Sequence, residues 1–479
     1  MKKTKIVCTL GPSTDSDETL EKMINLGMNV ARFNFSHGSY EEHERRFVQL
    51  KRVAKKCGKP VAVLLDTKGP EIRVKQFKDG KVSVTHDNTF TFTTRDVEGT
   101  EEIVSVTYNK FPQDVVVGME ILVDDGLIAM KVISKNDTDV VCKILNDGVI
   151  SNNKGVNIPG AHLTMPFISE KDRQDILFGI KLGVDFIAAS FTRSARDILA
   201  VKNILRENNA SHIEVIAKIE NLEGVENIDG VIEEADGIMI ARGDMGVEIP
   251  NEDVPVLQKL LIKKMNAAGK KVITATQMLD SMMKNPRPTR AEATDVANAI
   301  YDGTSAVMLS GETAAGAYPV EAVETMARIV RRAEKAIDYK VLFEKRRNYV
   351  ERDTTNAIAR ATCATAHDLN AKAIIAVTKS GQTARVISKF RPEVPIFSCT
   401  TSETAYRQLG LAWGVHPVLI EEEHDTFELL EHAVAAVEKA GYVKEGDIVV
   451  ITAGIPLGIS GTTNLIKVHV VGEDMRQEI

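Results

Sequence analysis

The sequence is poor in aromatic residues and has no long basic segment. Phe, Trp and Tyr make up 5% of the 479 residues, and there is a single Trp. Proteins that bind single-stranded nucleic acid stack bases on aromatic rings, and binding to the phosphate backbone needs clustered lysines and arginines. The formal net charge is −7. We therefore expect no nucleic-acid partner, and an anionic substrate must be attracted locally, by a few cations or a bound metal.

Cysteines are few, and long apolar runs are missing. The five cysteines form no CxxC pair and have no histidines at zinc-site spacing, which predicts free thiols in a reducing compartment. The basic start of the chain is not followed by the continuous apolar segment of a signal peptide. No apolar run approaches the roughly 20 residues of a membrane span. These features predict a soluble, cytoplasmic protein with no membrane partner.

Short apolar strands alternate with amphipathic helices in residues 1–70 and again in residues 166–340. The predicted strands are Lys5–Leu10, Asn29–Phe33, Pro60–Leu65, Phe186–Ser190, Glu214–Lys218, Gly237–Ala241, Lys271–Thr276 and Ser305–Leu309. Eight such units, closed on themselves, predict a (β/α)8 TIM-type barrel. A doubly wound open sheet is the alternative, but the sequence has no dinucleotide-binding GxGxxG motif.

Two other stretches differ from the barrel segments in their pattern of apolar and polar residues. Residues 71–165 contain alternating runs such as Thr89–Thr93 and Asp139–Ile144, separated by Asp-Gly turns, and this pattern predicts an inserted antiparallel β domain. Residues 341–479 return to alternating strands and helices, which predicts a separate C-terminal three-layer α/β domain.

Polar residues follow the predicted barrel strands at their carboxyl ends. Lys218 and Glu220 are two residues apart, so they share one face of a strand. Asp244 follows the next strand, and two carboxylates on adjacent strand ends suit an octahedral Mg²⁺ that takes further ligands from a substrate. Taken alone, Lys218 and Glu220 are explained equally well by a salt bridge at a strand end and by a role in a site.

A second set is rich in neutral oxygens and consists of Asn34, Ser36, Asp66 and Thr67. One carboxylate among neutral ligands suits a monovalent cation, although for this set taken alone hydroxyls that merely cap loops are the simpler explanation. Arg32 and Arg73 flank it and are suited to bind a carboxylate or phosphate with two hydrogen bonds. Thr276 and Ser310 end later strands, where a hydroxyl orients a reactant or only completes a strand-end hydrogen bond.

The C-terminal region contains a candidate anion site between a strand and a helix. Its residues are Thr378, Lys379, Ser380, Gly381, Gln382 and Thr383. The amides and hydroxyls of such a turn form a nest for an anion at a helix N-terminus. A second loop, with Gly454, Gly458 and 460–464, is expected nearby. From spacing alone, an ordinary strand–helix turn is the simpler interpretation.

Motifs along nearly the whole chain resemble the pyruvate kinase family, of the bacterial type without an additional C-terminal domain. They are Asn34-Phe35-Ser36-His37-Gly38, Leu65-Asp66-Thr67-Lys68-Gly69-Pro70-Glu71-Ile72-Arg73, Lys154-Gly155-Val156-Asn157, Lys218-Ile219-Glu220-Asn221, Ala241-Arg242-Gly243-Asp244, Ala275-Thr276-Gln277-Met278 and Met308-Leu309-Ser310-Gly311-Glu312. The resemblance implies phosphoryl transfer from phosphoenolpyruvate to ADP, with Mg²⁺ (or Mn²⁺) and K⁺ as cofactors. It also implies a homotetramer, and a mobile lid formed by the insertion at residues 71–165, which is expected to be a β-barrel.

The resemblance also assigns roles by position. Lys218, Arg32 and Thr276 would be catalytic, and Arg32, Lys218, Gly243, Asp244 and Thr276 would hold phosphoenolpyruvate. Glu220 and Asp244 would bind Mg²⁺, and Asn34, Ser36, Asp66 and Thr67 would bind K⁺. Asn34, His37, Arg73 and Lys154 would contact the nucleotide. Glu71 stands where K⁺-dependent members carry Glu, which predicts K⁺ dependence.

In this family the segment that matches residues 378–383 binds the phosphate of an allosteric effector. The sequence Ala453-Gly454-Ile455-Pro456-Leu457 lacks the Trp-Arg pair that would hold a second phosphate, which favours AMP or a sugar monophosphate over fructose 1,6-bisphosphate. Two other functions remain as alternatives: a Mg²⁺-dependent barrel lyase or aldolase acting on a 2-keto acid, and a catalytically silent sensor of a phosphorylated metabolite.

Overall fold

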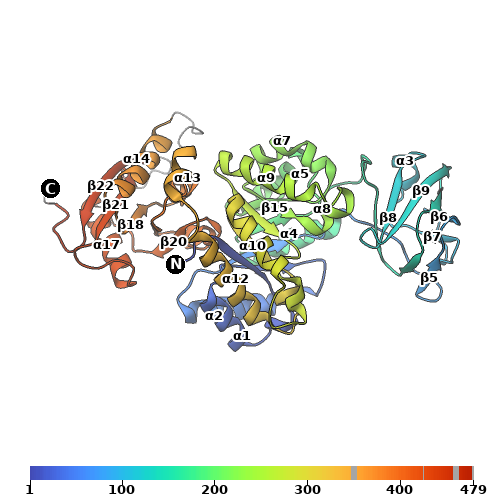
Figure 1. Cartoon of the computed structure of the whole chain (residues 1–479), viewed down its shortest axis with the longest axis horizontal. Helices are drawn as coiled ribbons and strands as arrows, with labels where there is room; N and C mark the ends of the chain where they lie inside the picture. Colours follow the sequence, from blue (N-terminus) through green and yellow to red (C-terminus); the bar gives the residue numbers. More distant parts are fainter. Residues whose placement is uncertain (347–352, 424, 457–462, 477–479) are drawn as a thin grey trace.

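The structure is a computed structural model that describes residues 1–346, 353–423, 425–456 and 463–476. Figure 1 shows three units in a row, with a central barrel, a β-rich insertion at one end and the C-terminal α/β unit at the other. No helix in these described ranges is long and apolar enough to cross a membrane.

The central unit is a closed barrel of parallel strands, ordered β1-β17-β16-β15-β14-β13-β3-β2. The strands are β1 (Lys5–Thr9), β2 (Val30–Asn34), β3 (Ala62–Asp66), β13 (Phe186–Ala189), β14 (Glu214–Ile219), β15 (Gly237–Ala241), β16 (Lys271–Ala275) and β17 (Ala306–Leu309). Three lie before the insertion and five after it, so the predicted TIM-type barrel is confirmed, with strand ends displaced by one or two residues.

Helices surround the barrel, and the longer ones bury apolar residues in its core. The surrounding helices are η1 (Pro12–Thr14), α1 (Asp17–Leu26), α2 (Tyr40–Cys57), α4 (Glu170–Leu182), α5 (Ala195–Glu207), α6 (Leu222–Glu226), α7 (Ile228–Glu234), α8 (Arg242–Glu248), α9 (Val254–Ala268), η2 (Asp280–Met283), α10 (Arg290–Asp302), α11 (Gly311–Ala314) and α12 (Pro319–Glu334). A capping box begins α4, where the Ser169 side chain accepts a hydrogen bond from the Asp172 amide and Asp172 reaches back to the Ser169 amide. Such a reciprocal cap satisfies amides that have no partner within the helix.

The insertion has its own hydrophobic core, centred on Phe90, Phe92 and Phe111. Its elements are β4 (Ile72–Arg73), β5 (Lys81–Val84), β6 (Thr89–Thr93), β7 (Ile103–Ser105), α3 (Phe111–Asp114), β8 (Glu120–Val123), β9 (Ile128–Lys135), β10 (Asp139–Ile144), β11 (Gly148–Ser151) and β12 (Gly155–Asn157).

Two corrections concern the insertion. Its described strands form a seven-stranded sheet and a separate two-stranded sheet, not the single closed β-barrel that was expected. The pairing is also not purely antiparallel, because β6 and β7 pair in parallel. Alternation identifies which residues of a strand face the core, but it does not specify the direction of the neighbouring strand.

The C-terminal unit has a five-stranded sheet ordered β20-β19-β18-β21-β22, in which only β22 is antiparallel to its neighbour. Separate apolar clusters cover the two faces of the sheet, one including α17 and the other α14 and α15, which gives the expected three layers. The elements are α13 (Tyr339–Arg346), α14 (Thr354–Asp368), β18 (Ala373–Val377), α15 (Gln382–Lys389), β19 (Ile396–Thr400), α16 (Glu403–Gln408), η3 (Leu409–Leu411), β20 (Val415–Leu419), α17 (Thr426–Lys439), β21 (Ile448–Gly454) and β22 (Thr463–Val470).

A buried carboxylate joins the barrel to the C-terminal unit. Asp185 is 1% exposed; its Oδ1 accepts a hydrogen bond from Arg407 Nε at 2.9 Å, and its Oδ2 accepts one from the Val63 amide at 2.8 Å. Gln408 donates to the backbone oxygens of Asp185 and His212. Burial raises the pKa of Asp185, while the positive charge of Arg407 opposes that rise. Arg407 therefore compensates a charge that burial would otherwise make costly.

Replacing Arg407 by Met should destabilise this junction by about 3 kcal/mol, because it leaves the Asp185 carboxylate buried without its cation. Urea unfolding followed by circular dichroism would show the loss as a lower midpoint. Arg45→Met is the matched control, since Arg45 forms an exposed pair with Asp15 that should contribute less than about 1 kcal/mol. Equal midpoints for Arg407→Met and the unsubstituted protein would contradict the assigned role of the pair.

Candidate active site

A network of buried charges lies at the carboxyl ends of β2, β3 and β14. Its centre is the fully buried carboxylate of Asp66. Asp66 Oδ2 accepts a hydrogen bond from Arg32 Nε at 2.6 Å, and Oδ1 lies 3.1 Å from Lys218 Nζ. Arg32 also donates from NH1 to Thr9 Oγ1 at 3.0 Å. One carboxylate thus orients two cations toward the mouth of the barrel.

Lys218 has two further partners. Its Nζ lies 2.9 Å from Glu220 Oε1 and donates to Ser190 Oγ at 2.8 Å. Burial opposes the ammonium charge, but Asp66 and Glu220 outweigh burial and raise the pKa of Lys218. Burial also disfavours the Asp66 carboxylate, yet Arg32 and Lys218 bring the pKa of Asp66 below its usual value. Both groups are therefore charged at neutral pH.

Ser190, at the end of β13, was not predicted as a site residue. Its Oγ lies 3.0 Å from Asp66 Oδ1 and 2.6 Å from the Thr67 carbonyl oxygen, and its single hydrogen serves one of these acceptors at a time. The hydroxyl therefore connects Lys218 to β3. The only sequence signal was its place at a strand end, which it shares with several other hydroxyl residues.

Glu220 and Asp244 form a pair of acidic groups beside Lys218. Glu220 is 1% exposed, and its Oε2 accepts a hydrogen bond from the Phe191 amide at 2.6 Å. Its Oε1 has the ionic contact with Lys218 but, within the described part of the chain, no properly angled hydrogen bond. Burial, opposed by Lys218 and reinforced by Asp244, raises the pKa of Glu220 to about 7. Burial likewise raises the pKa of Asp244. Two carboxylates in this position would be stabilised by a further positive charge.

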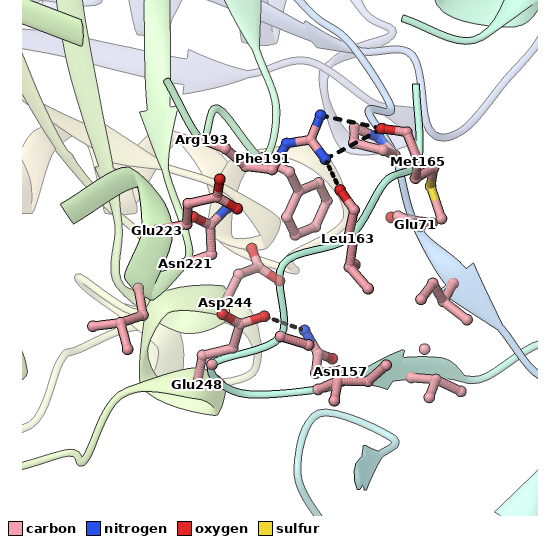
Figure 2. A pocket seen from close by; sticks show the side chains of 18 of the residues that line it. Glu71, Asn157, Leu163, Met165, Phe191, Arg193, Asn221, Glu223, Asp244 and Glu248 are labelled. Carbon is pink, nitrogen blue, oxygen red and sulfur yellow. Dashed lines mark hydrogen bonds between the residues drawn. The ribbon is translucent and has the colours of Figure 1, made fainter. Parts of the chain in front are cut away.

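A cavity of about 480 Å³ lies between the barrel mouth and the insertion. Figure 2 shows Asp244 and Glu248 on the barrel side, with Asn157 opposite, donating to Glu248 Oε1 at 3.5 Å. Arg193 closes one side of the cavity by donating to the Leu163 and Met165 carbonyl oxygens. The acidic residues that line the cavity are Glu71, Asp124, Asp125, Glu223, Glu226, Asp244 and Glu248. Most of these acids were not predicted from the sequence.

Four of the predicted site residues line this cavity, namely Glu71, Arg73, Lys154 and Asp244. The two cations are already paired in the structure, Arg73 with Glu71 at 2.7 Å and Lys154 with Asp124 at 2.8 Å. The other predicted residues, Arg32 and Lys218 among them, lie outside the lining of this cavity within the described chain. Asp244 connects the cavity with the network around Asp66. It lines the cavity, and its carboxylate interacts electrostatically with Lys218 of the network.

The predicted monovalent-cation residues cluster on two neighbouring strand ends. Asn34 and Asp66 lie opposite each other where β2 pairs with β3, and Thr67 follows directly. Asn34 Oδ1 accepts a hydrogen bond from the Ser36 amide at 3.1 Å. His37 is exposed beside them. These residues supply amide, hydroxyl and carboxylate oxygens, which are the kinds of donor that a monovalent cation binds.

Thr276 and Gly243 approach each other at the ends of β15 and β16. A Cβ atom on residue 243 would lie 2.7 Å from Thr276 Cγ2, which is closer than real contacts allow, so a side chain at this position would displace Thr276. Thr276 has a φ of 73°, in the left-handed region that β-branched residues rarely adopt. The backbone at this corner of the mouth is therefore held in an unusual conformation.

Two family models match the chain. One describes the barrel domain of pyruvate kinase and matches residues 1–323, and the other describes its alpha/beta domain and matches residues 356–469. The chain belongs to the pyruvate kinase family. Pyruvate kinases are phosphotransferases of glycolysis, and this chain is an enzyme of that class.

Individual pyruvate kinases are similar over nearly the whole chain. The pyruvate kinases of Staphylococcus aureus strains USA300 and NCTC 8325 are each 55% identical over 477 residues, which cover 99% of this chain and 81% of theirs. A crystal structure of a pyruvate kinase from Cryptosporidium parvum has a TM-score of 0.93 at 42% identity, covering 98% of this chain and 96% of that one.

Pyruvate kinases generally depend on Mg²⁺ and K⁺, and the site residues can be compared with those ions. Within the described ranges no group of three or more His, Cys, Asp or Glu side chains is placed to hold a metal by itself. Glu220 and Asp244 offer two carboxylates, and Glu220 Oε1 is buried without a hydrogen bond. Such a pair fits Mg²⁺, which usually binds one or two carboxylates and completes its shell with water and substrate phosphates.

The loop predicted to bind an effector connects β18 to α15. The Gly381 amide donates to Thr378 Oγ1 at 3.1 Å, and Lys379 Nζ lies 3.4 Å from Glu422 Oε1. Thr383 Oγ1 lies 2.7 Å from Thr463 Oγ1, so the two predicted loops meet there. Leu457, Gly458 and residues 460–462 of the second loop lie outside the described residues.

Proposed function

We propose that this protein transfers the phosphoryl group of phosphoenolpyruvate to ADP, giving ATP and pyruvate in the last step of glycolysis. The observation that carries the proposal is the Lys218 ammonium, held between Asp66 and Glu220 at the barrel mouth. Phosphoryl transfer depends on positioning and charge stabilisation more than on covalent help from the protein. A buried, oriented ammonium supplies that stabilisation for the moving phosphoryl group and the developing enolate.

The neighbouring residues complete a site for phosphoenolpyruvate. Arg32 would bind the substrate's negative charge while Asp66 keeps its guanidinium in place. The tight Gly243–Thr276 approach would let the backbone at Gly243 contact the substrate, with Thr276 as the hydroxyl beside it. Thr276, acting through water, is the candidate for protonating the enolate. Asp244 joins this set through its charge coupling to Lys218.

Glu220 and Asp244 would hold Mg²⁺ (or Mn²⁺), and Asn34, Ser36, Asp66 and Thr67 would hold K⁺. When bound, these cations neutralise the charge of two polyanions in contact. The raised pKa of Glu220, caused by burial and by Asp244, supports the assignment because a cation would relieve the same repulsion.

The nucleotide would bind in the cavity between the barrel and the insertion. Arg73 and Lys154 come from the insertion, where each now pairs with a carboxylate, and nucleotide phosphates would exchange for those partners. His37 and Asn34 would contact the nucleotide from the β2 end.

In this proposal the three parts of the chain have separate roles. Residues 71–165 act as a lid on the catalytic barrel, which is formed by residues 1–70 and 166–340, and residues 341–479 form the effector domain. Lid closure would exclude water that competes for the phosphoryl group.

Regulation is the finer part of the proposal. The turn at residues 378–383 would bind the phosphate of an effector, AMP or a sugar monophosphate, at the start of α15. The proposed assembly is a homotetramer, as expected for the family, whose subunit interfaces would transmit the effect.

Lys218→Met should lower kcat by about 10²–10³, because it removes one preorganised charge that acts in the transition state. The assay follows pyruvate formed from phosphoenolpyruvate, with and without ADP, in K⁺ and Mg²⁺. Lys22→Met is the control, since Lys22 forms an exposed pair with Glu18 on α1, and it should keep full activity. Full turnover by Lys218→Met would refute the assigned role, and pyruvate formation that needs no ADP would refute phosphoryl transfer.

Glu71→Lys should reduce the dependence on K⁺, because the substituted side chain brings its own positive charge to the site. Glu71 contacts Arg73 at 2.7 Å and Lys68 at 3.8 Å, so Glu71→Gln is a control for losing those contacts without gaining a cation. Initial rates are measured in buffer free of K⁺ and Na⁺. If folded Glu71→Lys stays as inactive as Glu71→Gln without K⁺, the expectation is wrong.

Phosphorylated effectors should lower the phosphoenolpyruvate concentration at half-maximal rate, and Lys379→Met should weaken that effect. The test titrates AMP, ribose 5-phosphate and fructose 1,6-bisphosphate against both proteins. We expect a response to AMP or ribose 5-phosphate and little response to the bisphosphate. An equal response of both proteins to every effector would exclude the loop at residues 378–383 as the site.

A further inference from the structure

A second cavity, of about 290 Å³, lies between the barrel and the C-terminal unit. On the barrel side it is lined by Glu214 and Lys271, the first residues of β14 and β16. Because Lys218 and Glu220 lie where β14 ends, this cavity is at the opposite end of the barrel from the candidate active site. On the other side it is lined by α15 residues and by Arg391 and Trp413.

The lining of this cavity is strongly basic. Its ionisable side chains are Lys270, Lys271, Arg385, Lys389 and Arg391 against Glu214 and Asp236. The Glu214 carboxylate already pairs with two of these cations, Lys271 at 2.6 Å and Arg385 at 2.8 Å. Asp236 lies 3.7 Å from Lys202. The carboxylates of the lining therefore compensate only part of its positive charge.

Arg391 is the most deeply buried cation of the lining that has no carboxylate partner among the described residues. It is 4% exposed, and its NH2 donates to Asn266 Oδ1 at 2.8 Å and to the Gly303 carbonyl oxygen at 2.9 Å. Its guanidinium stacks on the Trp413 ring, 4.4 Å from the centroid. No carboxylate of the described chain pairs with Arg391, and its NH1 has no hydrogen-bond partner there. Buried charges in proteins are normally paired, because an unpaired one is costly.

Two further polar atoms of the lining are buried without partners. Among the residues that the structure describes, Arg385 Nε has no acceptor and Asn356 Oδ1 has no donor. Arg346 adds positive charge nearby, since it donates to the Lys389 carbonyl oxygen at 3.0 Å. Burial, and then the charge of Arg346, hold the pKa of Arg391 well below its usual value. The unused groups are mostly donors and cations, the complement of a small oxyanion.

We propose that this cavity binds a phosphate group, either inorganic phosphate or the end of a phosphate monoester. A phosphate oxygen pair accepts hydrogen bonds from a planar guanidinium in fork geometry, which water cannot match because it carries no charge. A protonated phosphate oxygen would donate to Asn356 Oδ1. The bound anion would connect Arg391 and α15 of the C-terminal unit to the start of β16. The proposal concerns binding alone and does not depend on the catalytic activity.

The chain carries its own reporter for this site. Trp413 is the one tryptophan of the sequence, and it lines the cavity in contact with Arg391. Titration of the full chain with sodium phosphate, at ionic strength held constant with sodium chloride, should change its fluorescence in a saturable way. Glycerol 1-phosphate is the monoester probe. A response to inorganic phosphate only, or to the monoester only, identifies which form is bound.

Four variants locate the anion. Arg391→Met should weaken binding at least about tenfold, because it removes the charge-assisted hydrogen bonds. Lys389→Met, which removes a half-buried cation of α15, should weaken binding severalfold. If circular dichroism shows that Arg391→Met does not fold, the phosphate affinity of Lys389→Met is the test of the proposed site. Lys22→Met, on the exposed face of α1, is the control and should leave the affinity within about twofold; Lys379→Met tests the turn at residues 378–383, and the Trp413 response should persist in it.

The proposal fails if the unsubstituted protein gives no saturable response to either probe, by fluorescence and by calorimetry. It also fails if a folded Arg391→Met, or Lys389→Met in its place, binds as tightly as the unsubstituted protein. A response that is lost in Lys379→Met would assign the anion to the turn at residues 378–383, and would overturn the proposal as well.

Discussion

The Asp66 carboxylate is the constraint on which the candidate active site depends. It is fully buried at the end of a barrel strand, and it remains charged because Arg32 and Lys218 lie against its two oxygens. Each cation is in turn held in place by that carboxylate, so removing any one of the three leaves a buried charge uncompensated. The barrel supplies the rigidity, since β2, β3 and β14 are each hydrogen-bonded on both sides. Chemistry on an anionic substrate needs cations whose positions are set before the substrate arrives, and this network provides them.

The fold was largely predictable because its signals are local. Each barrel strand is a short apolar run followed by polar residues, and three such runs before the insertion and five after it are the number that the closed barrel contains. The shared face of Lys218 and Glu220 followed from the two-residue period of a strand. Asn34 and Asp66 were placed together because the carboxyl ends of neighbouring parallel strands meet, as their pairing shows.

Features that depend on contacts between distant segments were not predictable in the same way. Ser190 carries no more signal than other strand-end hydroxyls, and its link between Lys218 and Asp66 follows only from the positions of three strands. The cavity is acidic because the insertion contributes Asp124 and Asp125 to a lining that also contains Glu223 and Glu248 of the barrel. The parallel pairing of β6 with β7 is likewise invisible to alternation. In each case the sequence specifies a residue's face, and the tertiary structure decides what that face meets.

The pairing of β1 with β17, which closes the barrel, affects how the chain folds during its synthesis. The first strand, β1, is bonded on one side to β2 and on the other to β17, with Lys5 opposite Ala306 and Cys8 opposite Leu309. During synthesis one edge of β1 therefore stays unpaired until some three hundred later residues have emerged from the ribosome. Pairings over such distances form slowly, and an open strand edge invites association with other chains. Newly made chains should thus be most vulnerable to aggregation, and most in need of chaperones, just before β17 arrives.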